Sequence, residues 1–165
     1  MLTQLIMLCF AGLLIAGAVS DAWRYKIPNW LSGALLLPFL AAVVVNFPGF
    51  AGLGLHLATG VVALILGMAI FAAGWWGGGD AKMFAAAAFM FGWPQGLHFL
   101  FYTALAGGGL VVVLIALRHL LPAFPALVKH TPGTALAQGA PVPYGIAIAI
   151  AGLILLPQAS LLSNF

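Results

Sequence analysis

The 165-residue chain contains only two acidic residues, Asp21 and Asp80, and each lies in a distinctive local sequence at the edge of an apolar segment. Asp21 opens the stretch DAWRYKIPN, and Asp80 follows three consecutive glycines at positions 77–79. If the two carboxyl groups meet, one can act as a general base on water while the other, protonated, polarises a carbonyl group. Two carboxylates held close together cannot both ionise cheaply, so the pair is expected to share one proton. This is the minimum chemistry that an aspartyl protease needs.

The composition shows what kind of structure must position this pair. The chain is 65% hydrophobic and only 4% charged, whereas soluble domains carry about a quarter charged residues. Apolar segments near the roughly 20 residues that cross a bilayer core predict an all-α integral membrane protein that forms a single domain over residues 1–165. The five full-length segments are 2–20, 30–47, 53–74, 97–118 and 142–162, and a sixth, shorter one covers 81–93.

The basic residues predict the orientation, because Lys and Arg are retained on the cytoplasmic side of a membrane. With about six spans, all five basic residues fall on one face; they are Arg24, Lys26, Lys82, Arg118 and Lys129. This places both termini outside and both aspartates on the cytoplasmic side. The net charge of +3 then follows from topology, and we expect no nucleic-acid partner.

The N-terminal segment has an alternative interpretation as a cleaved signal peptide, since residues 18–20 read Ala-Val-Ser after an apolar run. No Lys or Arg precedes that run, and basic residues follow it. This pattern favours an uncleaved helix.

The segment at 81–93 would form a helix of only about 20 Å at 1.5 Å per residue, which is too short for the bilayer core. We expect residues 74–80 to dip toward the membrane inside the protein, with Gly79 allowing close backbone approach and positive φ. One alternative is a re-entrant hairpin over residues 81–117. In a second alternative, the glycines form a plain turn and Asp80 is the helix N-cap. Asp21 is then an interfacial residue whose charge is neutralised by Arg24.

Metal or redox chemistry has little support in the sequence. Cys9 is the only cysteine, so no intramolecular disulfide or multi-cysteine zinc site can form. The histidines show no liganding cluster. We therefore expect no metal and no cofactor.

Three motifs resemble a known family. Gly77, Gly79 and Asp80 match the Gly-x-Gly-Asp signature of intramembrane aspartyl proteases, and together with Lys82 they resemble the second catalytic motif of type IV prepilin peptidases. The stretch at 21–29 resembles the first motif of that family. Residues 142–145, Val-Pro-Tyr-Gly, are similar to a recurring motif of its short branch, which is associated with Tad/Flp pili.

The resemblance implies an aspartic endopeptidase of the bacterial inner membrane, with its active site facing the cytoplasm. The substrates of this enzyme would be Flp-like prepilins, which lose a basic leader peptide, and its other partner would be the lipid bilayer. The resemblance implies no oligomeric state. Asp21 and Asp80 would be catalytic. The supporting residues would be Gly77, Gly79, Lys82, Arg24, Pro28, Asn29 and Tyr144. Longer family members with paired cysteines also N-methylate the pilin, and with Cys9 alone that activity is not implied.

Two non-enzymatic functions remain as alternatives. A small transporter or assembly subunit could use a membrane aspartate to relay protons or ions, although that role favours a carboxylate near mid-membrane. The chain could also be a structural membrane subunit without chemistry.

Overall fold

The computed structural model describes residues 1–123 and 133–162, and these residues form helices and connecting turns with no strand. The helices are α1 (Leu2–Arg24), α2 (Asn29–Ala34), α3 (Leu36–Val45), α4 (Gly49–Ala72), α5 (Gly78–Phe91), α6 (Gln95–Leu120) and α8 (Tyr144–Leu155), with short 3-10 turns at Leu121–Ala123 and Leu156–Gln158. Among the described residues, three helical stretches are long and apolar enough to cross a membrane, namely Leu2–Arg24, Gly49–Ala72 and Gln95–Ala123. The all-α prediction is confirmed, and the chain is a multi-pass membrane protein.

The segment predicted as one span at 30–47 is instead two helices, α2 and α3, which meet at Leu35. Pro38 explains the break, because a proline nitrogen carries no hydrogen and cannot donate the helical bond to the carbonyl of Ala34. The two pieces still pack against each other and against α5.

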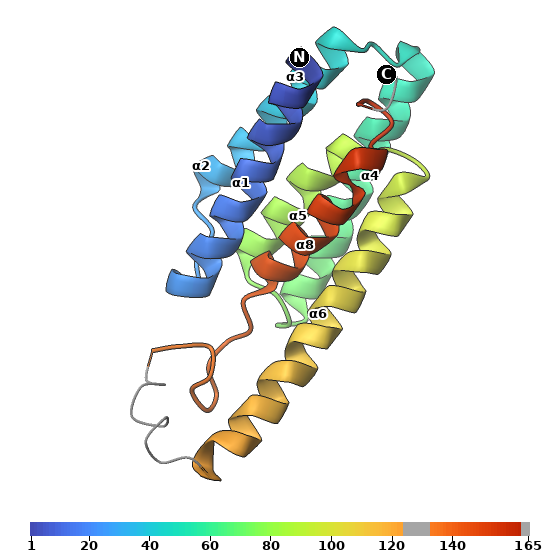
Figure 1. Cartoon of the computed structure of the whole chain (residues 1–165). Coiled ribbons are helices and arrows are strands. Elements are labelled where there is room, and N and C mark those ends of the chain that lie inside the picture. The colour runs from blue at the N-terminus through green and yellow to red at the C-terminus, as the bar shows by residue number, and fades with distance from the viewer. Residues whose placement is uncertain (124–132, 163–165) are drawn as a thin grey trace.

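Helix α5 lies at the centre of the bundle (Figure 1), where α4 packs along it and α1 and α6 flank α8. Small residues make this close packing possible. A methyl group placed on Gly67 of α4 would lie 3.1 Å from the Cα atom of Ala81 in α5. Within α5, only Lys82 is exposed from Asp80 to Phe91, so the short helix is held by protein on nearly all sides.

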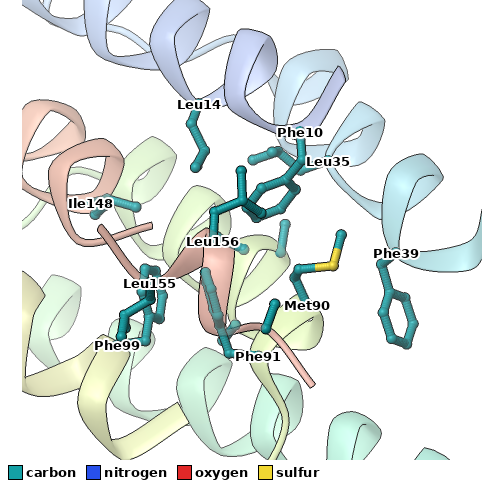
Figure 2. Close-up of a cluster of buried hydrophobic side chains, with 14 of the residues drawn as sticks. Phe10, Leu14, Leu35, Phe39, Met90, Phe91, Phe99, Ile148, Leu155 and Leu156 are labelled. Atoms are coloured by element: carbon teal, nitrogen blue, oxygen red, sulfur yellow. The ribbon is translucent and has the colours of Figure 1, made fainter. Parts of the chain in front are cut away.

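Large apolar side chains from α1, α5, α6 and α8 fill the centre (Figure 2). The ring of Phe91 stacks on that of Phe99 with centroids 4.9 Å apart, and it meets the ring of Phe10 edge-on at 6.0 Å. These contacts fix α5 against α1 and α6. Other large apolar side chains, such as those of Val44, Phe50 and Ile65, are exposed on the outside of the bundle, as expected of a lipid-facing surface.

The described part of the chain begins and ends at the same end of the bundle (Figure 1). The C-terminal end of α1 and the first residues of α5 and α8 lie toward the opposite end. Both aspartates are on these ends, so the fold gathers them on one side, as the distribution of basic residues predicted. Arg118 is in the described part of the chain, whereas Lys129 lies outside it.

Candidate active site

Asp21 lies in the last turn of α1 and is 5% exposed. Its Oδ2 atom accepts a 2.8 Å hydrogen bond from the backbone N–H of Gly145, the second residue of α8. The end of α1 presents carbonyl groups, which disfavour a negative charge, whereas the start of α8 presents N–H groups, which favour it. The last helix of the bundle therefore stabilises a carboxylate that belongs to the first.

Asp80 is the third residue of α5 and is 6% exposed. Its Oδ2 atom accepts a 2.9 Å hydrogen bond from the backbone N–H of Gly77, the N-cap residue of the same helix. Its Oδ1 atom is buried and has no hydrogen-bond partner among the described residues. Asp80 is thus not the N-cap itself. It bonds back to the N-cap residue, as an acidic residue at the third helical position does in a capping box, and it keeps one oxygen uncommitted.

The two carboxyl groups border the same two cavities. One cavity, of about 500 Å³, is lined by the end of α1, residues 25–29 and the glycine run. The other, of about 410 Å³, is lined by residues 74–77, residues 140–142 and Tyr144. Four residues line both cavities: Asp21, Tyr25, Gly77 and Asp80. The structure therefore brings together the two aspartates that the sequence singled out.

The glycine run allows α5 to begin unusually close to another segment. A methyl group on Gly79 would lie 3.1 Å from Cβ and 3.2 Å from the carbonyl oxygen of Ile27. The predicted close approach is therefore observed. The predicted positive φ is wrong for these glycines: Gly77 is extended and the next two begin the helix, whereas the positive φ, 77°, occurs at Gly74.

Ile27 lies between the two aspartate-bearing regions. It is buried, its backbone contacts Gly79, and its Cδ1 atom would lie 3.1 Å from a methyl group on Gly145. This single side chain thus spaces the starts of α5 and α8. The isoleucine of the first motif therefore acts here through packing.

Two of the remaining supporting residues, Lys82 and Asn29, also meet. The Lys82 ammonium group donates a 2.9 Å hydrogen bond to Oδ1 of Asn29, which links α5 to the first residue of α2. Pro28, the N-cap residue of α2, is extended with ψ of 140°. Arg24 is exposed and lines the first cavity. The Lys82 ammonium group is therefore bonded to a side-chain amide.

Tyr144 borders the second cavity, where its ring lies 5.8 Å from that of Trp76. Gly107 of α6 makes room for it, because a methyl group there would lie 3.2 Å from the tyrosine ring. The segment before α8 is tied down by Arg118, which donates 2.7 Å hydrogen bonds to the carbonyl oxygens of Ala135 and Ala140.

Sequence reasoning missed two residues of this site, Gly145 and Tyr25. Gly145 follows Tyr144 in a motif that was noticed, and its missing side chain was the available signal. Tyr25 lies inside the first motif, at a position to which no role was given. No group of three or more His, Cys, Asp or Glu side chains in the described ranges could hold a metal ion.

Comparison with known proteins identifies the family. The model of the type IV leader peptidase family matches residues 8–112, which include both aspartates and the glycine run and end before α8. No curated protein and no solved structure matched the chain. Because the family match covers more than half of the sequence, this protein belongs to the type IV leader peptidase family.

Proposed function

We propose that the protein is an aspartic endopeptidase of the bacterial inner membrane, which removes the basic leader peptide from Flp-like type IV prepilins at the cytoplasmic face. One observation supports this most directly. The only two acidic side chains in the sequence border the same two cavities, and each has its Oδ2 atom held by a backbone N–H group at the start of a helix.

This arrangement suits hydrolysis by a carboxyl pair. The ionised member removes a proton from water as the water oxygen attacks the scissile carbonyl carbon, and the protonated member donates its proton to the carbonyl oxygen. The resulting tetrahedral species loses the amine after a proton reaches its nitrogen. Each carboxyl group lies at the start of a helix, Asp80 in the first turn of α5 and Asp21 beside the first turn of α8, so the helix dipoles can stabilise the charged form of either one.

The position of the site also fits a substrate cut at a membrane boundary. The dyad lies near the ends of α1, α5 and α8, and Trp23, Trp30 and Trp75 are exposed on the segments around it. Exposed tryptophans are typical of the membrane–water interface. A precursor whose leader is cytoplasmic and whose helix lies in the bilayer would present its junction at this depth.

The other site residues have structural roles in this proposal. Gly77 orients Asp80 through its N–H group, Gly79 permits the close start of α5, and Pro28, Asn29 and Lys82 tie α2 to α5. Arg24 and Tyr144 border the cavities that receive the peptide. The placement of both carboxylates toward one end of the bundle favours this function over a proton or ion relay, which favours a carboxylate near mid-membrane.

The test is co-expression with a Flp-like prepilin in a host that lacks other prepilin peptidases, followed by intact-mass measurement of the pilin. We expect a loss of mass equal to the leader, and no loss when either aspartate is replaced by Asn. An intact precursor at verified membrane levels of the wild-type enzyme would overturn the proposal.

A further inference from the structure

Tyr25 occupies an unusual position immediately after α1. Its φ of 51° and ψ of 33° are left-handed, a conformation that residues other than glycine rarely adopt. Its N–H group donates a 2.9 Å hydrogen bond to the carbonyl of Asp21, which closes the helix end. This turn keeps the side chain beside the dyad, where it lines both cavities.

The Tyr25 hydroxyl is buried and has no hydrogen-bond partner among the described residues. Buried tyrosine hydroxyls normally have one, because leaving such a group unpaired is unfavourable. The only other buried side-chain oxygen of this site without a partner is Oδ1 of Asp80. The described site therefore holds an uncommitted donor and an uncommitted carboxyl oxygen, and the two do not bond to each other.

We propose that Tyr25 is a catalytic residue whose O–H group donates a hydrogen bond to the carbonyl oxygen of the scissile peptide bond. This inference rests on the proposed peptidase function. When water adds to the carbonyl carbon, the π electrons move to the oxygen, which takes a proton from the protonated aspartate and gains a stronger hydrogen bond from Tyr25. The aspartate that took the proton from water then gives it to the amide nitrogen. The C–N bond breaks as one hydroxyl of the tetrahedral species returns its proton to the other aspartate and forms the new carboxyl carbonyl, and Tyr25 keeps its own proton throughout.

A purely structural role makes a different prediction. If the hydroxyl supported the fold, removing it would leave a partner unpaired and destabilise the protein. Because the described structure shows no partner, Tyr25→Phe should leave the unfolding temperature unchanged or raise it. A lower rate together with unchanged stability is the signature of a group that acts on the substrate.

The first experiment compares Tyr25→Phe with the wild type in detergent, with purified prepilin as substrate. We expect kcat to fall on the order of a hundredfold, the scale found when one donor to the reacting oxygen is removed, while KM changes by less than about threefold. Tyr102→Phe, on α6 and outside both cavities, is the matched control and should retain the wild-type rate. An unchanged kcat, a change in KM alone, or a lowered unfolding temperature would each overturn the proposal.

The second experiment measures binding of two prepilin-derived peptides that cannot be cleaved. One carries a statine-type hydroxyl in place of the scissile carbonyl, and the other a reduced amide, which has no oxygen there. Tyr25→Phe should weaken binding of the hydroxyl peptide by about tenfold and leave binding of the reduced-amide peptide unchanged. Equal losses of affinity for the two peptides would contradict the assignment. This inference alone would be refuted if the wild type cleaves prepilin, Asp21→Asn does not, and Tyr25→Phe stays fully active. The proposed function would be refuted if the wild type itself does not cleave prepilin.

Discussion

The backbone N–H of Gly145 donates a 2.8 Å hydrogen bond to Oδ2 of Asp21, a residue 124 positions earlier in the chain. The approach is so close that a methyl group on Gly145 would lie 3.0 Å from Cβ and 3.1 Å from Oδ2 of Asp21. Both distances are shorter than ordinary van der Waals contacts. The orientation of Asp21 therefore depends on a glycine that begins the last helix.

Gly145→Ala is predicted to slow prepilin cleavage by roughly tenfold. The added methyl group would push Asp21 aside by a few tenths of an ångström, and a displacement of about 1 Å in a catalytic constellation can cost on the order of a hundredfold. The rate should be measured with purified enzyme at matched concentration. Gly108→Ala is the control, since a methyl group there meets nothing within 4 Å and should leave activity unchanged. A Gly145→Ala enzyme with the wild-type rate would show that this contact does not position Asp21.

Asp21→Asn and Asp80→Asn are each predicted to lower the cleavage rate by at least about a thousandfold, since each removes one half of the acid–base pair. Asparagine is close in size to aspartate and its carbonyl oxygen can still accept the backbone N–H, so both variants should remain folded in the membrane. Leader removal is read by intact mass, and membrane levels by immunoblot. Substantial cleavage by either purified variant would refute the carboxyl-pair mechanism.

Gly79→Val is predicted to remove most activity although it changes no catalytic atom. A branched side chain at this position would collide with the backbone of Ile27 and displace the start of α5, which carries Asp80. Cleavage should be assayed in detergent at matched protein levels. Gly109→Val provides the control, because a methyl group on Gly109 meets nothing within 4 Å; equal rates for the two variants would mean that the glycine run is only a linker.

The proposed orientation predicts that both termini and the α3–α4 connection face outward, whereas residues 26 and 129 face the cytoplasm. Single cysteines at positions 26, 47 and 129 in a Cys9→Ala background can be labelled with a reagent that does not cross the membrane. Only position 47 should react in intact cells. Labelling of position 129 from outside would show either that the orientation is the reverse of the proposed one or that residues 81–117 form a re-entrant hairpin.

The sequence alone determined the properties that depend on local composition. Hydropathy predicted the membrane class and the positions of most helices, because each helix must satisfy its own backbone hydrogen bonds in lipid, but it did not show the break at Leu35. The scarcity of acidic residues singled out Asp21 and Asp80, since nothing else in the chain could act as a carboxyl pair. Motif order then identified the family that the match over residues 8–112 confirms.

Tertiary structure decided what depends on contacts between distant segments. Local patterns do not show that Gly145 meets Asp21 or that Ile27 spaces the starts of α5 and α8. Nor do they show that the Tyr25 hydroxyl lacks a hydrogen-bond partner within residues 1–123 and 133–162. Tertiary structure also determined the backbone conformation of the three glycines at positions 77–79. Glycine can adopt positive φ, but α5 begins at Gly78, so Gly78 and Gly79 take helical conformation. The positive φ in this region occurs at Gly74. Ile27, which lies 52 positions before Gly79 in the sequence, approaches so closely that a side chain at position 79 would collide with it.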